Sequence, residues 1–227
     1  MSNDAMMIAI DRIRFTWTRS KKMRVYAVGI AADNLGKVIV TEPPSVSEIR
    51  HRPKKGRPSE WDFAGDGYPI YQRTGGLPDI IVAHLLVIRD RSGMRRAGEI
   101  ISAVKEDRGA QDAIGKASEL LKSAGTGGLA AASALALLLP VASAVGTIIS
   151  QKRDEVLQTI SGSMFLDAQR KSEDFFTQTI RSPDNNMEVE ADVFLFDGAN
   201  DQPSVADTAN AETTLDAQGL LFVKPGA

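Results

Sequence analysis

The sequence contains no cysteine, only two histidines and few aromatic residues. Its 227 residues include Cys 0, His 2 and an aromatic share of 6%. Without cysteine the chain forms no disulfide and offers no thiolate to a metal ion. This composition fits a reducing compartment, although exported bacterial proteins can also lack cysteine. The 43% hydrophobic and 25% charged shares are those of an ordinary globular protein, and the length suffices for one large domain or two small ones.

Common catalytic and nucleotide-binding signatures are also missing. No G-x-S-x-G, H-E-x-x-H, EF-hand or Walker A sequence occurs. The glycine-rich "GTGGLAAAS" at 125–133 lacks the Lys-Ser/Thr of a phosphate-binding loop and indicates a turn between helices. His84 lies in an apolar run, where we expect a core residue with its hydrogen bonds satisfied. We therefore predict no catalytic residue, no metal site and no cofactor, and a chain that is not an enzyme.

Carboxylates keep one enzymatic hypothesis open. Asp62 and Asp66 lie in an aromatic loop, Asp154 and Glu155 are expected on a helix, and Asp90 ends a strand. Calcium needs about 6–8 oxygen ligands, and no D-x-D spacing supplies them. An enzyme with a cryptic carboxylate site is a third hypothesis, behind two non-enzymatic ones.

The most unusual stretch, Ser123–Gln151, carries no charged side chain. Within it, 127–149 could form a helix of roughly 35 Å at ~1.5 Å per residue, which is enough to cross a bilayer core. Its many alanines contribute little to insertion, and no Trp or Tyr flanks it. Small residues also permit close helix packing, and a helix that is apolar all round is typical of a buried one. We favour burial against protein, including a second subunit, over membrane contact.

Strand patterns surround this stretch. Alternating apolar residues predict strands over Met7–Trp17, Arg24–Ala31 and Lys37–Thr41, joined as an antiparallel meander. In the first, the apolar face changes parity at Asp11–Arg12, which predicts a β-bulge. Ile80–Ile88 is apolar at both parities and predicts a central strand covered on both sides. Met187–Phe196 alternates most regularly of all. Ser45–Gly76 is expected to be an irregular loop that four aromatic residues, at 61, 63, 68 and 71, attach to the rest of the domain. A short strand is expected at 163–168, and either a strand or a helix at 172–180.

Between these strands the spacing predicts two helices. The first covers Met94–Ala124 with a break near Gly109, and the second runs from the turn at Gly125–Thr126 to about Ile160. The predicted fold is α+β: an antiparallel β-sandwich-like domain with a long helical hairpin inserted between strands. Its parts are N-terminal strands at 1–90, the hairpin at 91–160, strands that complete the sandwich at 161–197 and an acidic tail at 198–227. A short strand near the end of this tail, "GLLFVK", could dock onto a neighbour.

Charge is distributed unevenly along the chain. The first 57 residues hold twelve Lys/Arg against five Asp/Glu, whereas 182–227 hold one against nine. Such ends can attract each other, within a chain or between neighbours. A loop at 51–58 and its surroundings predict a patch for an anionic partner, such as a lipid headgroup or a nucleic acid, although a pI near 5.8 argues against nucleic acid. The patch comprises Arg50, Arg52, Lys54, Lys55 and Arg57, with Arg12, Arg14, Arg19, Lys21, Lys22 and Arg24 adding positive charge nearby.

Together these features favour a non-enzymatic assembly protein that associates with copies of itself, or with a partner protein, through its helical hairpin and charged ends. The alternative is a membrane-active toxin or effector that inserts 127–149. The residues expected to make the contact are Leu129, Leu135, Leu137, Leu138, Leu139, Val145, Ile148 and Ile149. The N-terminus, "MSNDAMMIAI", has no basic region before its apolar residues, so no secretory signal is predicted and a cytoplasmic location is expected, with non-classical release or membrane association left open.

Overall fold

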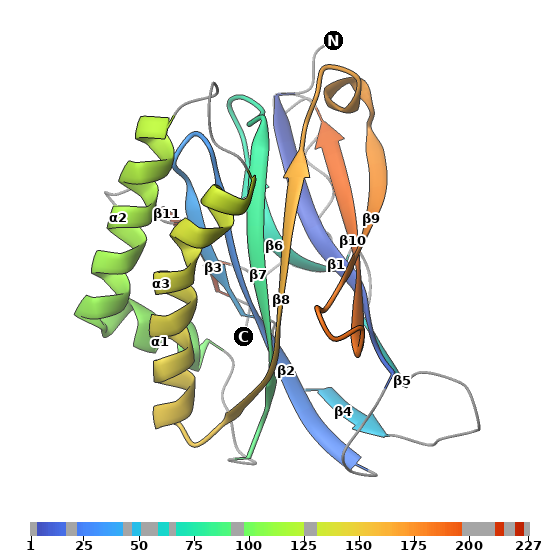
Figure 1. Cartoon of the computed structure of the whole chain (residues 1–227), viewed down its shortest axis with the longest axis vertical. Coiled ribbons are helices and arrows are strands. Elements are labelled where there is room, and N and C mark those ends of the chain that lie inside the picture. The colour runs from blue at the N-terminus through green and yellow to red at the C-terminus, as the bar shows by residue number, and fades with distance from the viewer. Residues whose placement is uncertain are drawn as a thin grey trace.

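The computed structural model describes residues 4–16, 22–42, 47–50, 59–63, 67–91, 98–124, 131–196, 212–215 and 221–224. Over these residues the fold combines two mainly antiparallel sheets, A and B, with three α-helices. Figure 1 shows three layers, in which sheet B lies between sheet A and the helices. The predicted mixture of helices and antiparallel sheets is confirmed.

Sheet A has the strand order β5-β1-β10-β9, with β6 also paired to β1. Its strands are β1 (Ala5–Phe15), β5 (Ser59–Asp62), β6 (Tyr68–Arg73), β9 (Phe175–Arg181) and β10 (Met187–Phe196). The β1–β10 register shifts at Asp11, which confirms the predicted bulge. Because of this shift, Ile8 and Ile10 before it and Ile13 and Phe15 after it all enter one core.

Sheet B has the order β11-β12-β3-β2-β7-β8, with β4 also paired to β2. Its strands are β2 (Lys22–Asp33), β3 (Val38–Thr41), β4 (Ser47–Arg50), β7 (Ile80–Arg89), β8 (Glu155–Phe165), β11 (Glu212–Leu215) and β12 (Leu221–Lys224). The prediction for β7 is confirmed, since it pairs on both sides, with β2 and β8. Leu85 faces the core between the sheets and Leu86 faces the helices. β7 therefore contributes to two separate apolar cores.

Three helices follow one another between β7 and β8: α1 (Glu99–Glu106), α2 (Arg108–Ala124) and α3 (Ala131–Gln151). The break predicted near Gly109 falls at Asp107, whose Oδ1 accepts the Ala110 amide at 2.7 Å and caps α2. The turn predicted at Gly125–Thr126 lies outside the described residues.

The predicted extension of the last helix to Ile160 is wrong. Arg153 adopts a left-handed backbone with φ 65. Its amide donates to the Ser150 carbonyl at 2.9 Å, and that of Asp154 donates to the Ile149 carbonyl at 3.3 Å. These two bonds form a Schellman end. Glycine is usual at the left-handed position, so an arginine there gave the sequence no stop signal. β8 consequently begins at Glu155, before the boundary predicted at 161.

Three further expectations need correction. β1 and β2 lie in different sheets, so the predicted meander holds only for β2–β3. The number of residues between β1 and β2 is sufficient to span the ~10 Å between packed sheets. The expected loop 45–76 contains β4, β5 and β6. The tail beyond 197 contains β11 and β12, and β12, which lies within "GLLFVK", pairs with β3. Of the segment left open at 172–180, residues 175–180 lie in β9, and 163–168 includes the end of β8.

Candidate interaction surface

Most of the apolar residues predicted for the interaction surface face inward. Leu138, Val145, Ile148 and Ile149 are buried against sheet B. Leu135 and Leu137 are partly buried beside them, and Leu139 alone of the described members is well exposed, at 56%. Leu129 lies outside the described residues. The structure thus places the centre of the predicted surface inside the protein.

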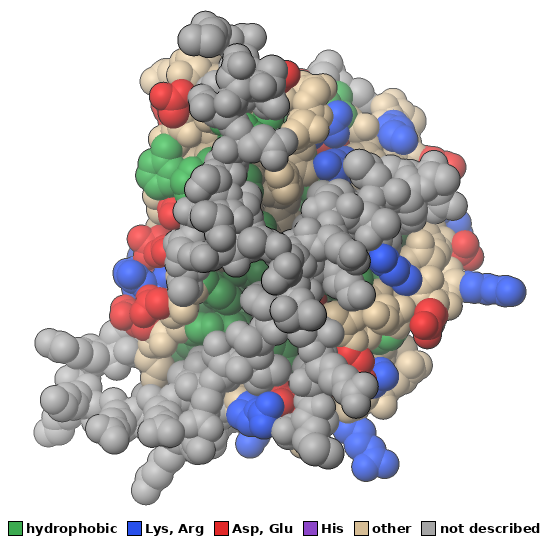
Figure 2. Space-filling model, turned by 180° about the vertical axis from the view of Figure 1, so that it is seen from behind, with side chains coloured by type: hydrophobic (Ala, Val, Ile, Leu, Met, Phe, Trp, Pro, Cys, Tyr) green, Lys and Arg blue, Asp and Glu red, His purple; other side chains and the backbone are tan. Residues whose placement is uncertain are grey.

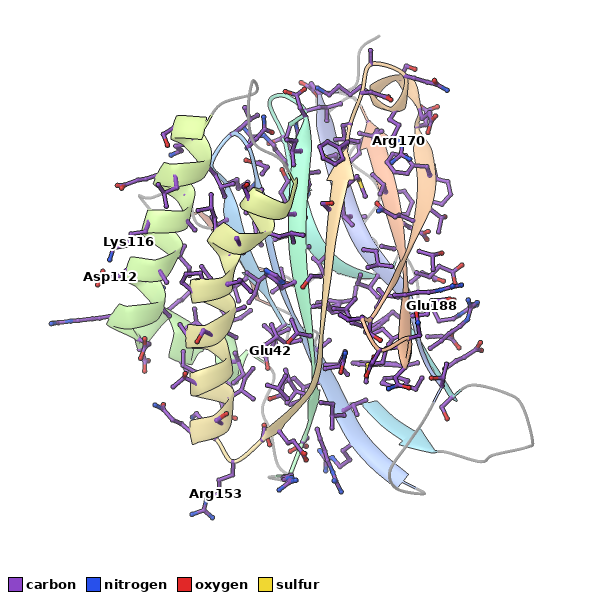
Figure 3. All side chains as sticks on the ribbon, in the orientation of Figure 1. Glu42, Asp112, Lys116, Arg153, Arg170 and Glu188 are labelled. Carbon is purple, nitrogen blue, oxygen red and sulfur yellow. The ribbon has the colours of Figure 1, made fainter. Side chains whose placement is uncertain are left out.

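The opposite side of α3 is exposed and uncharged. It presents small or apolar side chains and no Asp, Glu, Lys or Arg along the whole helix. We call this surface the outer face of α3; its exposed residues are Ser133, Ala136, Leu139, Pro140, Ser143, Thr147, Ser150 and Gln151. The neighbouring α2 differs, because Asp112 and Lys116 point from it to solvent (Figure 3).

Two hydroxyl groups on the outer face, those of Thr147 and Ser150, are satisfied within the helix. Thr147 Oγ1 donates to the Ser143 carbonyl at 3.0 Å, and Ser150 Oγ donates to the Gly146 carbonyl at 2.9 Å. This back-bonding turns the hydroxyl protons away from solvent. The face consequently presents mostly methyl and methylene groups, and covering it leaves these hydroxyl protons satisfied.

Pro140 adds one acceptor to the middle of this face. Proline has no amide hydrogen, so the carbonyl of Ala136 lacks the donor that an ordinary helical residue would provide. Both residues are exposed. The outer face therefore combines an apolar surface with a backbone carbonyl that can accept a hydrogen bond from outside.

Buried acids fasten the helices to sheet B. Glu42 Oε2 accepts the amides of Ile100 and Ile101 at 3.1 and 3.3 Å, at the start of α1. In Figure 3 this side chain lies in the interior, beside α3. A carboxylate is stabilised there because the first amides of a helix point toward it and have no partner in the helix.

Asp154 performs the same task in the turn after α3, near the start of α1, where Lys152 pairs with Glu99 at 2.9 Å. Its carboxylate accepts the Tyr26 hydroxyl at 3.0 Å and the Arg91 amide at 2.9 Å. The expectation that Asp154 and Glu155 lie on a helix is wrong: Asp154 is buried in the turn after α3, and Glu155 begins β8 and pairs with Arg91. The two acids belong to structural contacts.

His84 confirms the expectation of a satisfied core residue. Nδ1 lies 2.7 Å from Ser161 Oγ and Nε2 lies 3.2 Å from the Leu135 carbonyl, so the ring links β7 to both β8 and α3. Burial lowers its pKa below the ordinary value, and the bond to the Leu135 carbonyl partly opposes this. The neutral imidazole is therefore favoured in the folded protein. His51 lies outside the described residues.

The predicted basic patch falls mostly outside the described residues, which include none of Arg52, Lys54, Lys55 and Arg57, nor Arg19 and Lys21. Of Arg50 and Lys22 the structure describes the backbone, in β4 and β2. Three nearby arginines have acidic partners in the chain itself: Arg12 pairs with Asp62, Arg14 with Glu188 at 2.8 Å, and Arg24 with Asp90 at 3.0 Å. The N-terminal basic charge is thus partly neutralised.

Ion pairs on sheet A join the two ends of the chain. Arg14 also contacts Glu190 at 3.1 Å, and Arg181 contacts Glu188 at 2.9 Å. The hydrogen bonds from Arg14 and then Arg181 lower the pKa of Glu188. Figure 2 shows acidic and basic side chains side by side along the margin formed by sheet A. At these residues the attraction between basic N-terminal and acidic C-terminal parts acts within one chain.

Sequence reasoning missed a buried polar cluster around Asp33. Asp33 Oδ2 accepts the Tyr71 hydroxyl at 2.6 Å and Arg73 Nη1 at 2.7 Å, while Oδ1 accepts the Leu35 and Lys37 amides, each at 2.9 Å. Burial, then the charge of Asp33, raises the pKa of Tyr71, so its hydroxyl stays protonated as a donor. The cluster fastens the β2–β3 turn to β6. An Asp that opens an Asn/Gly turn was the one available signal.

Nothing in the described residues forms a metal centre, since no three His, Asp or Glu side chains converge there. Ser133–Gln151 of α3 is long and apolar enough to cross a membrane by length and composition. Comparisons with protein-family models, with curated proteins and with solved structures each gave no match.

Proposed function

We propose that the helical region is an insertion in which α2 and α3 act as a hairpin, and that the outer face of α3 binds a second copy of the chain. The protein is then a non-enzymatic assembly module. The observation that carries this proposal is that the outer face is exposed yet has no charge, and that hydroxyls of Thr147 and Ser150 are already bonded within the helix. Burying such a face in a contact costs little desolvation free energy, because it has no charge and few polar groups that need new partners.

A second α3 is the occupant that fits this face best. Small residues such as Ala136 and Ser143 let two helices approach closely, and Leu139 supplies exposed apolar area between them. A two-fold axis across α3 would place the same patch on both subunits, as closed dimers require. In that arrangement a hydroxyl of the partner's outer face can donate to the free Ala136 carbonyl.

Light scattering of the purified full chain over a range of concentrations tests this proposal. We expect a dimer for the wild type and a monomer for Leu139→Lys, because a charge in the contact would be desolvated without a partner. A substitution at this exposed position should change the free energy of unfolding by no more than about 0.5 kcal/mol. The matched control is Lys116→Glu on α2, which should stay dimeric. A monomeric wild type, or equal dissociation of both variants, contradicts the proposal.

Membrane insertion is the second candidate, supported by the length and composition of Ser133–Gln151. It requires α3 to leave sheet B, which would expose apolar residues such as Val28, Leu86 and Ile88 to water. Dye release from anionic liposomes, at neutral and at acidic pH, tests this. Release that Leu139→Lys reduces and Lys116→Glu leaves unchanged would support insertion, and absence of release at both pH values would overturn it.

A further inference from the structure

A partly open cavity lies between the two sheets, on the side of sheet B opposite to the helices. β8 ends sheet B and β9 ends sheet A, and side chains of both strands line it. Gly162 of β8 allows the close approach, because a Cβ there would lie 2.5 Å from Ile180 Cδ1 of β9. The cavity therefore lies along the seam between two end strands, where access from solvent does not require a sheet to open.

The cavity has a volume of about 40 Å³. On a scale of ~10–15 Å³ per water this is space for about three waters, or for a molecule of a few carbon atoms. Its lining is almost wholly apolar and comes from both sheets: Ile8, Ile10, Ile70, Ile81, Ala83, Leu85, Ile160, Gly162, Ser163, Met164, Gln178, Ile180, Val189 and Ala191. An apolar cavity of this kind favours an apolar guest over water.

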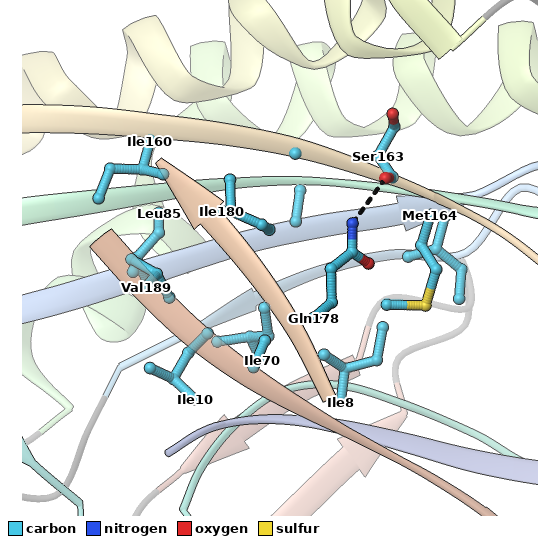
Figure 4. Close-up of a pocket in the computed structure, with 14 residues that line it drawn as sticks. Ile8, Ile10, Ile70, Leu85, Ile160, Ser163, Met164, Gln178, Ile180 and Val189 are labelled. Atoms are coloured by element: carbon cyan, nitrogen blue, oxygen red, sulfur yellow. Dashed lines mark hydrogen bonds between the residues drawn. The ribbon is translucent and has the colours of Figure 1, made fainter. Parts of the chain in front are cut away.

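Gln178 is the polar exception in this lining. Its neighbours on the inward face of β9, Phe176 and Ile180, are apolar and pack against the sandwich core. Its Nε2 donates to the Ser163 carbonyl at 3.3 Å, and Figure 4 shows the side chain reaching from β9 toward β8. Since a carbonyl can only accept, the atom facing Ser163 must be the amide nitrogen.

The oxygen of the Gln178 amide, unlike the nitrogen, has no hydrogen-bond partner among the described residues. Oε1 is buried, and no donor among the described residues reaches it. A buried acceptor without a partner is unfavourable, and such groups in folded proteins are rare. The cavity is therefore otherwise apolar but contains one hydrogen-bond acceptor, Gln178 Oε1, that has no donor.

We propose that this cavity binds a small uncharged molecule with a short apolar body and one hydroxyl group, such as ethanol or another short-chain alcohol. The apolar body occupies the space between Ile10, Leu85 and Ala191, and the hydroxyl donates to Gln178 Oε1. A charged ligand does not fit, because neither Lys, Arg, Asp nor Glu lines the cavity. The site is independent of α3, which packs on the other face of sheet B.

Titration of the full chain with ethanol and with dimethyl ether, followed by calorimetry, tests the proposal. The two probes are isomers of similar size, but only ethanol can donate to Gln178. We expect ethanol to bind about tenfold more tightly, as one hydrogen bond to a buried acceptor permits. Gln178→Met keeps the length of the side chain and removes the acceptor, so it should abolish the preference. Thr179→Val, on the exposed face of the same strand, should leave the preference unchanged.

Methyl NMR of the methionines gives a second readout that needs no variant at Gln178. Met164 and Met187 both belong to the sandwich core, but of the two only Met164 lines the cavity. Ethanol should shift the Met164 methyl resonance through direct contact and leave that of Met187 in place, with Met164→Leu providing the assignment.

Three outcomes would overturn the proposal: no binding of ethanol, binding that leaves Met164 unshifted, or a preference for ethanol that survives Gln178→Met. If Gln178→Met does not fold, the wild-type preference and the Met164 shift decide. Because Leu139→Lys does not touch the cavity, ethanol binding by that variant separates this proposal from the proposal for α3.

Discussion

The two faces of sheet B are covered in different ways. Toward sheet A, large side chains such as Phe15, Trp61 and Tyr71 fill the core, and a cavity is left at the β8–β9 seam. Toward the helices, the core consists of aliphatic residues and alanines, with Tyr26 as the one aromatic residue in the described set. Two packed sheets keep a nearly constant distance from each other, so a space remains where the side chains of β8 and β9 do not fill it. Helices with small residues can approach a sheet more closely and leave less space.

Polar contacts of both kinds occur in the two cores. The helical layer is attached through Glu42 at the start of α1, through Asp154 after α3 and through the neutral His84 ring. Within the sandwich, the Tyr68 hydroxyl has neutral partners, the Gly29 amide at 3.2 Å and Thr41 Oγ1 at 2.8 Å, whereas the Tyr71 hydroxyl donates to Asp33 at 2.6 Å. Hydroxyls with a charged partner and with neutral partners can therefore be compared by substitution.

The largest effect is expected for Leu86→Ala. Leu86 is buried against the helices, and its truncation leaves a void that the close-packed helical layer cannot fill. We expect a loss of about 3–5 kcal/mol in the free energy of unfolding, measured by urea denaturation.

Leu85→Ala is the matched control, because this residue precedes Leu86 on β7 and lines the cavity on the other face. Its loss should lie nearer the lower limit of about 2 kcal/mol, since its surroundings are already incompletely packed. Equal losses at the two positions would show that the two cores are packed alike.

A smaller effect is expected for Tyr26→Phe, which removes the hydroxyl that Asp154 accepts. Hydrogen bonds to charged groups contribute about 1.5–3 kcal/mol, and those between neutral groups about 0.5–1.5 kcal/mol. Tyr68→Phe, in the sandwich, removes a hydroxyl with neutral partners and should cost less. The measurement is again denaturant unfolding. A cost at Tyr68 equal to that at Tyr26 would contradict the view that the charged partner of Tyr26 makes its hydrogen bond the stronger one.

The smallest effect concerns pH. The pKa of His84 is lowered in the folded protein, so below about pH 6.5 the unfolded chain takes up the proton more readily than the folded one. Stability is therefore lost as the pH falls from that value toward the folded pKa. The midpoint of thermal unfolding should fall less on acidification in His84→Gln than in the wild type. An identical pH dependence of the unfolding midpoint in the two proteins would show that protonation of His84 does not affect the stability of the fold.

Local patterns predicted the elements whose residues repeat regularly. The alternation of Met187–Phe196 gave β10, the apolar run from Ile80 gave the central β7, and the parity change at Asp11 gave the bulge. The end of α3 was missed because Arg153 occupies a backbone position that usually selects glycine. The cavity could not be predicted, since Ile8, Leu85 and Gln178 meet only when the two sheets pack.

The sequence by itself determined that a charge-free helix would exist and that strands would flank it, because periodicity and helix spacing are local properties of the chain. Only the tertiary structure decided which side of that helix is covered. Leu138 and Val145 turn inward onto sheet B, whereas Leu139 and Pro140 stay exposed. Because the run is uncharged throughout, charge does not distinguish its inner from its outer side, and the position of sheet B decides which face stays exposed.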